Sequence, residues 1–247
     1  MFNLNNSLEG KVVLVTGGGS GLGEATARAF ACAGAKVAVV DLNGANAERV
    51  ANDLAGEGHV FYACDVSNAD AVFSTVQSVV DKFGRLDVVV NSAAVDYVKP
   101  VVEMTVEQWD RVIGVNLRGP FLMAKAALPT MQKQKSGHII NVASTAAVRA
   151  WGSASAYHAT KWGLRGFSRG LGVEGRPDNI RVTTIIPGGM ATHFFDRFPE
   201  QGIPMPDERN LQDPANVASA IVFAVLMPQE SVVQEVMVTP LTETSWP

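Results

Sequence analysis

Apolar residues along the chain fall into short continuous runs that alternate with longer amphipathic stretches. Runs such as VVLV, VAVV and VVV are apolar on successive residues, as is typical of strands that are buried on both faces of a parallel sheet. The pattern predicts strands at residues 11–16, 36–41, 59–63, 86–91, 137–143, 180–185 and 235–238.

Helices are predicted between these strands, because the intervening stretches are long and amphipathic. Alternation of strand and helix predicts an α/β fold with a parallel sheet covered on both faces. No linker, break in composition or repeat beyond this alternation divides the chain, so we expect a single domain over residues 1–247. The predicted helices lie at about residues 21–33, 44–54, 68–83, 105–134, 154–174 and 214–227.

The stretch from residue 187 to 214 departs from the alternation. Three prolines limit regular structure there, and several apolar side chains have no periodic spacing. A connection of this length is either a functional lid or a poorly ordered loop, and we place a substrate loop at about residues 188–213. The residues concerned are Pro199, Pro204, Pro206, Met190, Phe194, Phe195, Phe198 and Met205.

Composition narrows the class of protein. Hydrophobic residues make up 47% of the chain and charged residues 18%, which is typical of a globular protein. A net charge of −4 without a basic block argues against a nucleic-acid partner. We expect no membrane partner and a cytoplasmic location, because no apolar run reaches the length of a span and the first residues do not resemble a signal peptide. Cys32 and Cys64 have no metal-ligand spacing, so we expect no metal.

A glycine-rich turn, TGGGSGLG, follows the first strand and precedes the first helix. Glycines let the backbone approach a pyrophosphate, whose charge the following helix N-terminus stabilises. A tight turn without a ligand is the alternative interpretation. The position between strand and helix favours a dinucleotide site formed by Gly17, Gly19, Ser20, Gly21, Leu22 and Gly23.

Asp41 ends the second predicted strand, eighteen positions after Gly23. A carboxylate there accepts hydrogen bonds from the adenosine ribose hydroxyls and repels a 2′-phosphate. No Arg or Lys directly follows Asp41, and Ser20 stands where a basic residue could meet that phosphate. Both features favour NAD over NADP.

The segment YHATK carries Tyr157 and Lys161 four residues apart, on one face of the predicted helix. The spacing alone fits an acid/base pair or an aromatic ring that packs on a lysine stem.

The motifs together resemble the classical short-chain dehydrogenase/reductase family over nearly the whole chain. After the glycine turn come Asp65-Val66, NSAA from Asn91 where the family has N-N-A-G, Asn116 in GVNLRG, Ser144 in NVAST, Tyr157, Lys161, and Pro187-Gly188 with Thr192. Ser92 and Ala94 depart from N-N-A-G, and the C-terminus lacks the family's D-G-G but carries Trp246 as an apolar anchor. The resemblance implies a doubly wound Rossmann fold with a seven-stranded parallel sheet flanked by helices.

The resemblance also implies catalytic roles. Tyr157 would be the general acid/base, and Ser144 would hold the substrate oxygen. Lys161 would bind the nicotinamide ribose and lower the pKa of Tyr157. Asn116 would position a water that links Lys161 to solvent. His158 lies on a different helix face, so we expect no catalytic role for it.

Further site residues follow from the resemblance. A cofactor would also contact Asp65, Val66, Asn91, Ala93, Tyr157, Lys161, Pro187, Gly188 and Thr192. A largely apolar substrate pocket would be formed by Val95, Trp151, Met190, Phe194 and Phe195, with Tyr97, Val148, Arg149 and His193 nearby.

The resulting hypothesis is an enzyme that interconverts a secondary alcohol and a ketone with NAD, on a moderately hydrophobic small-molecule substrate. An NADPH-dependent ketone or 3-oxoacyl reductase is one alternative, and a non-catalytic dinucleotide-binding sensor or scaffold is another. The family also implies a homo-oligomer, a tetramer or a dimer, through the two long helices after the fourth and fifth strands. Glycines at Gly163, Gly166, Gly170 and Gly172 fit close packing there.

Overall fold

A seven-stranded parallel sheet forms the centre of the computed structural model, which describes residues 8–196, 198–199, 202–203 and 205–243. The strand order is β3-β2-β1-β4-β5-β6-β7, so the predicted parallel sheet is confirmed. Trp246 lies outside the described residues. The strands are β1 Val12–Thr16, β2 Lys36–Asp41, β3 Val60–Ala63, β4 Val88–Asn91, β5 Gly137–Val142, β6 Ile180–Pro187 and β7 Glu235–Val238.

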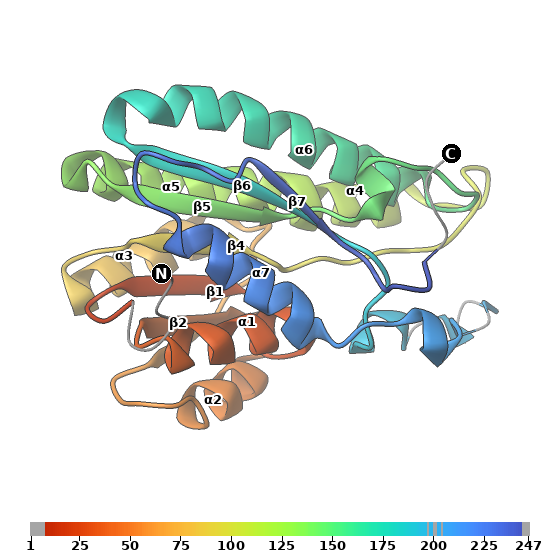
Figure 1. Ribbon diagram of the computed structural model, residues 1–247. Coiled ribbons are helices and arrows are strands. Elements are labelled where there is room, and N and C mark those ends of the chain that lie inside the picture. Colours follow the sequence, from red (N-terminus) through yellow and green to blue (C-terminus); the bar gives the residue numbers. More distant parts are fainter. Residues whose placement is uncertain (1–7, 197, 200–201, 204, 244–247) are drawn as a thin grey trace.

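Helices cover both faces of the sheet (Figure 1). Alternate residues of β1 enter different cores: Val13 and Val15 pack with α1 and α7, whereas Val12 and Leu14 pack with α3 and α5. Burial of both faces explains why the strands are apolar on successive residues. The helices are α1 Gly21–Cys32, α2 Gly44–Asn52, α3 Ala69–Phe83, α4 Val106–Ile113, α5 Gly119–Gln134, α6 Ser155–Gly175 and α7 Pro214–Leu226.

The long helix expected at residues 105–134 is interrupted. A π-helical turn, Gly114–Arg118, separates α4 from α5. Asn116 lies in this turn, and its side-chain amide exchanges two hydrogen bonds with the backbone of Val95. A π-turn inserts a residue into the helical repeat and is frequent at functional sites. Apolar spacing along the chain does not reveal it, because the partner segment lies far away in sequence.

The strand order reverses between β1 and β4, since the chain first builds β2 and β3 on one side of β1 and then continues on the other. In open α/β sheets ligands bind in the crevice at the carboxyl ends of the strands at such a point. The loops that follow β4, β5 and β6 gather at this edge (Figure 1).

The connection after β6 contains two short 3-10 turns, His193–Phe195 and Glu208–Asn210. Met190 and Gln212 form an isolated parallel bridge that closes the base of this connection. The lid function expected for residues 188–213 stays a prediction. Among the described residues, no helix has the length and apolarity that a bilayer span requires.

Candidate active site

The glycine turn between β1 and α1 has no room for side chains. Gly17 has φ +65°, and a Cβ atom there would lie 2.9 Å from the backbone of Ala93. A Cβ atom on Gly23 would lie 1.9 Å from the carbonyl oxygen of Gly17. Ser20 makes no side-chain cap with α1, so the first backbone N–H groups of that helix can bind an anion. The turn therefore fits the diphosphate of a dinucleotide.

Asp41 lies at the end of β2 against this turn. Its Oδ2 accepts a hydrogen bond from the Gly19 backbone N–H at 2.9 Å, and its Oδ1 accepts one from Asn43 N–H at 2.9 Å. The predicted position of Asp41 beside the glycine turn is thus what the structure shows.

A basic side chain that the spacing did not reveal also reaches the turn. Arg49 of α2 donates to the Gly19 carbonyl oxygen at 3.0 Å and pairs with Glu24 of α1 at 2.7 Å. The hydrogen bond from Arg49 holds the pKa of Glu24 below its ordinary value. Arg49 therefore shares the carboxylate of Glu24 with Arg28, which pairs with Glu24 at 2.8 Å.

Thr16 joins the glycine turn to the segment after β4. Its Oγ1 donates to the Val90 carbonyl oxygen and accepts hydrogen bonds from the N–H groups of Ser92 and Ala93, at 3.1 and 3.3 Å. Close approach of Ala93 to Gly17 follows from this link. The sequence analysis did not identify Thr16 as a site residue.

The side chain of Asn91 is part of a buried hydrogen-bond network that joins β4 to β5 and α6. Its Nδ2 donates to Asn141 Oδ1 at 2.8 Å, and Asn141 in turn donates to Ser168 Oγ at 2.8 Å. All three side chains are buried. Asn91 therefore supports the cofactor edge through a polar network, and its predicted contact with a cofactor rests on its backbone.

Asp65 and Val66 follow β3 at the same edge of the sheet. The Asp65 carboxylate is occupied by Ser67 and by an ion pair with Arg111 at 2.8 Å. Val66 is buried and contacts α5 at Gly119. The predicted adenine contact of these two residues stays a prediction.

The loop after β6 contacts the glycine turn through Thr192. The Gly188 N–H donates to Val238 O at 2.9 Å, directly after Pro187 ends the strand. The Thr192 side chain lies 3.3 Å from the position that a Cβ on Gly21 would occupy. The structure therefore brings the predicted cofactor residues of this loop against the glycine turn.

Ser144, Tyr157 and Lys161 come together at the carboxyl end of β5. Ser144 begins the short turn after β5, and Tyr157 and Lys161 lie in the first two turns of α6. Lys161 Nζ is 5.3 Å from the centroid of the Tyr157 ring and donates to the Val142 carbonyl oxygen at 2.9 Å. Both side chains are buried, Tyr157 at 9% and Lys161 at 2% relative exposure. The ring packing that the spacing left open is thus present, and the acid/base role of the pair stays a prediction.

The electrostatics of this group differ from the expectation. Burial raises the pKa of the Tyr157 hydroxyl, the charge of Asp96 raises it further, and a hydrogen bond with Ser144 lowers it in part. Burial lowers the pKa of Lys161 to about 8. The expected lowering of the Tyr157 pKa is not what the protein alone produces, because desolvation of the phenolate and the charge of Asp96 outweigh the hydrogen bond with Ser144.

Asn116 lies in the π-helical turn next to α6. Besides its bonds to Val95, its Nδ2 donates to Thr160 Oγ1 at 3.4 Å. These contacts fix the backbone that borders the site. Positioning of a water by Asn116 stays a prediction.

His158 links two parts of the substrate side. Its Nδ1 lies 2.9 Å from the Ala146 carbonyl oxygen, and its Nε2 accepts from the Trp151 N–H at 3.1 Å. A ring that accepts at Nε2 must carry its proton on Nδ1. His158 holds Trp151 in place, which the sequence analysis did not recognise. The expected lack of a catalytic role for His158 stays a prediction.

The predicted substrate residues divide into two groups. Phe194 packs on Tyr157 with ring centroids 5.7 Å apart, and Trp151 meets His158 edge to face with ring centroids 4.5 Å apart. Met190 packs against the core on the α1 side, and Val95 packs against the opposite core. Phe195 contacts Phe194 at 5.6 Å and Phe198 at 5.1 Å. Phe194 therefore lies directly against Tyr157, whereas Trp151 contacts His158, and the substrate roles of these residues stay predictions.

Asp96 is a site residue that the sequence analysis missed, although it named the neighbours Val95 and Tyr97. Burial raises the pKa of Asp96 to about 6, and its Oδ1 is buried without a hydrogen-bond partner among the described residues. The sequence feature that could have identified Asp96 is its carboxylate, which stands in a largely apolar run after β4.

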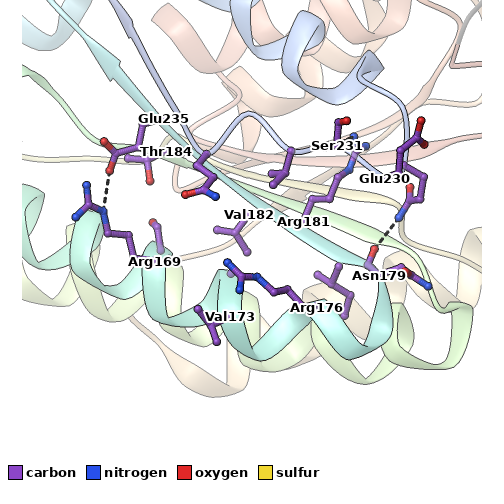
Figure 2. A pocket seen from close by; sticks show the side chains of 16 residues that line it. Arg169, Val173, Arg176, Asn179, Arg181, Val182, Thr184, Glu230, Ser231 and Glu235 are labelled. Carbon is purple, nitrogen blue, oxygen red and sulfur yellow. Dashed lines mark hydrogen bonds and ion pairs between the residues drawn. The ribbon is translucent and has the colours of Figure 1, made fainter.

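A hollow outside this group of residues is shown in Figure 2. It has a volume of about 710 Å³ and lies between the C-terminal half of α6, strand β6 and residues 229–235. Arg169 and Glu235 form an ion pair at 3.1 Å at its edge. None of the predicted catalytic residues lines it, so hollow volume does not identify the active site. Among the described residues, no group of three metal-ligating side chains occurs.

Comparisons with known proteins agree with this geometry. The family model for short chain dehydrogenase matches residues 11–202. A D-threitol dehydrogenase from Mycolicibacterium smegmatis is 43% identical over 189 residues, 76% of this chain and 73% of the relative.

Solved structures give the same result with different cofactors. A 3-ketoacyl-(acyl-carrier-protein) reductase from Brucella melitensis complexed with NADH is 35% identical, with a TM-score of 0.85 over 94% of this chain and 97% of that chain. A metagenomic short-chain oxidoreductase in complex with NADP is 31% identical, with a TM-score of 0.83 over 96% of this chain and 100% of that chain. The chain therefore belongs to the short-chain dehydrogenase/reductase family and is an oxidoreductase that acts on CH–OH groups.

Proposed function

We propose that the protein interconverts a secondary alcohol and a ketone by hydride transfer with NAD. The observation that carries this proposal is the grouping of Ser144, Tyr157 and Lys161 at the sheet edge that also holds the glycine turn. A dinucleotide sensor without catalytic activity does not require a buried tyrosine beside a buried lysine, so we favour the hypothesis of an enzyme over that of a sensor.

Ser144 and Tyr157 have different roles in this proposal. Ser144 hydrogen-bonds the substrate oxygen and orients it toward the Tyr157 hydroxyl. A nicotinamide held at this edge beside Lys161 would, when bound, supply the hydride acceptor for oxidation of the alcohol and the hydride donor for reduction of the ketone. In the oxidative direction the O–H proton passes to Tyr157, and the carbonyl double bond forms. In the reductive direction Tyr157 returns that proton to the oxygen.

Lys161 contributes position and charge. Its buried ammonium is held by the Val142 carbonyl oxygen next to the Tyr157 ring. From there it can hydrogen-bond the nicotinamide ribose. The chain by itself favours the phenol form of Tyr157, so the positive charge that an oxidised nicotinamide supplies would add to that of Lys161 in favouring the phenolate.

Preference for NAD rests on Asp41, whose carboxylate lies beside the glycine turn. A 2′-phosphate placed there would be repelled, whereas ribose hydroxyls would be bound. Arg49 favours the alternative of an NADPH-dependent reductase, as do relatives that bind NADP. We give Asp41 more weight than Arg49, because the Arg49 guanidinium is already engaged in an ion pair with Glu24.

Titration of the protein with NADH and NADPH tests this cofactor preference. We expect tighter binding of NADH, and in Asp41→Ser we expect roughly a 10- to 100-fold weaker binding of NADH, as for loss of a hydrogen bond to a charged group. Asp53→Ser, which removes an exposed carboxylate of the same region, is the matched control and should bind both cofactors as the wild type does. Tighter binding of NADPH by the wild type would overturn the assignment.

The substrate is proposed to be a small alcohol or ketone. Phe194 and Trp151 give the site an apolar border, which favours a moderately hydrophobic compound. The relationship to a D-threitol dehydrogenase adds polyols to the candidates. The relationship to a 3-ketoacyl reductase keeps a 3-oxoacyl substrate as the second candidate.

A further inference from the structure

Asp96 lies in a segment that is held rigidly at the edge of the catalytic group. The backbone of the preceding residue, Val95, is fixed by Asn116. The Val95 N–H donates to Asn116 Oδ1 at 2.9 Å, and Asn116 Nδ2 donates to the Val95 carbonyl oxygen at 2.8 Å. A rigid backbone at Val95 restricts where the next side chain can lie. Asp96 is thus a positioned carboxylate and not a surface charge that is free to move.

The carboxylate is incompletely satisfied. A hydrogen bond from the Tyr97 backbone reaches it, but Oδ1 is buried and has no partner among the described residues. Buried acceptors in native proteins are nearly always paired, because an unpaired one loses its hydration without compensation. An atom of this kind at an active site needs a donor that arrives with a ligand or a water.

The charge of Asp96 acts directly on the catalytic residues. It raises the pKa of Tyr157 and that of Lys161, and His158 and Lys161 lower the pKa of Asp96 in return. Interactions of this kind require short separation, since charges in proteins are screened with distance. Asp96 therefore lies near Tyr157, Lys161 and His158.

A neutral donor suits this place better than a cation. Lys161 already supplies positive charge to the same carboxylate, so a second ammonium would be repelled by it. A bound metal would need further ligands, and no group of three such side chains occurs among the described residues. A hydroxyl group donates a hydrogen bond without bringing charge.

We infer that Asp96 is a substrate-contacting specificity residue, which accepts a hydrogen bond from a second hydroxyl group on the substrate beside the carbon that is oxidised. This inference rests on the proposed function and narrows its substrate class to vicinal diols and longer polyols, or the hydroxyketones formed from them. The apolar border formed by Phe194 and Trp151 would then contact the carbon chain.

Matched four-carbon alcohols test the inference. The rate of NADH formation is measured with 2,3-butanediol, 2-butanol and 3-amino-2-butanol, for the wild type and for Asp96→Asn and Asp96→Leu. We expect the wild type to prefer the diol. In Asp96→Leu, kcat/KM for the diol should fall roughly 10- to 100-fold, as for loss of a hydrogen bond to a charged group, while kcat/KM for 2-butanol stays the same or rises. Asp96→Asn should lie between the two, because its amide oxygen still accepts.

Controls separate this role from a structural one. Asp110→Asn removes an exposed carboxylate on α4 and should change no preference. NADH affinity measured for each variant shows whether the cofactor site is intact, and a loss of diol preference with NADH binding retained supports the inference. Equal losses for diol and 2-butanol would overturn it, because a water-bound structural carboxylate would act on both alike.

Three further outcomes are distinguished. Preference of the wild type for the amino alcohol over the diol would overturn the assignment of a hydroxyl donor. Failure of the wild type to oxidise any of the alcohols, or to reduce acetoin and 2-butanone with NADH, would count against the proposed function itself. Oxidation of 2-butanol and the diol at equal rates would contradict the role of Asp96 and leave the proposed function intact.

Discussion

At the scale of single residues, burial dominates the behaviour of the catalytic group. Tyr157 and Lys161 are both buried, and desolvation favours the neutral form of each: it raises the pKa of the phenol and lowers that of the ammonium to about 8. The residue types alone suggest an attraction between phenolate and ammonium. The structure shows that such an attraction must first offset the cost of removing both charges from water.

The proton-transfer role of Tyr157 is tested by Tyr157→Phe, which removes the hydroxyl and keeps the ring. The ring contacts of Lys161 and Phe194 remain available to phenylalanine, so the fold and NADH binding should change little. We expect turnover to fall by a factor of roughly 100 or more, the usual contribution of a general acid/base. Steady-state rates and an NADH titration check both parts, and turnover near the wild-type rate would contradict the mechanism.

At the scale of elements, α6 has two faces with different tasks. Its buried face carries Tyr157 and Lys161, whereas Trp162, Gly166, Gly170 and Val173 recur every three or four residues on another face. Trp162 and Val173 are exposed at 50% and 56%, and a Cβ atom on either of the two glycines would meet nothing within 4 Å. An exposed apolar stripe with small residues fits close packing against another helix.

The expected homo-oligomer stays a prediction, and this stripe is the surface on which it depends. Sedimentation of the wild type should show a dimer or tetramer. Gly166→Arg should shift the distribution to monomer, because a long charged side chain would stand between the packed helices. Glu48→Arg, on the exposed side of α2, introduces the same side chain on the opposite layer and should leave assembly unchanged. A monomeric wild type would contradict this use of the stripe.

At the scale of the whole molecule, one buried histidine couples folding to pH. His138 of β5 is buried, and its Nε2 lies 2.8 Å from Thr183 Oγ1 of β6. The Thr183 hydroxyl donates to the Val233 carbonyl oxygen at 2.7 Å, so it accepts from Nε2–H, and Nδ1 carries the lone pair. Nδ1 has no partner among the described residues. Burial, together with the charge of Arg181, lowers the pKa of His138 well below its ordinary value.

The sign of the pH effect follows from this lowered pKa. Below about pH 6.5 the unfolded chain protonates His138 and the folded protein does not, so the unfolded state binds more protons. The free energy of unfolding should therefore fall as pH drops from about 6.5, by at most about 1.4 kcal/mol per pH unit from this group. Urea unfolding between pH 7.5 and 5.5 measures the slope.

His138→Leu should reduce that slope, because it removes the titrating ring and leaves the bond from Thr183 to Val233 in place. His193→Gln, at an exposed imidazole of the loop after β6, is the matched control and should keep the wild-type slope. An unchanged slope in His138→Leu would show that other groups govern the acid side of stability.

The sequence by itself determined the parallel sheet, the position of nearly every strand and helix, and the glycine turn. These features depend on local properties: apolar runs, helical spacing, and the rule that parallel strands present their carboxyl ends on one side. The glycines at Gly17 and Gly23 belong here as well, since only glycine fits the turn. The grouping of Ser144, Tyr157 and Lys161 was expected from the family resemblance, because the spacing alone left ring packing open.

Only the tertiary structure decided the electrostatics and the partners of the site. The π-turn at Asn116, the contact of Arg49 with Gly19 and the unpaired oxygen of Asp96 each depend on atoms from segments that are distant in the chain. Burial and hydrogen-bond satisfaction are properties of a packed environment, not of a residue type. For that reason the family resemblance could single out Tyr157 and Lys161, but only the packed structure shows that the charge of Asp96 acts on both.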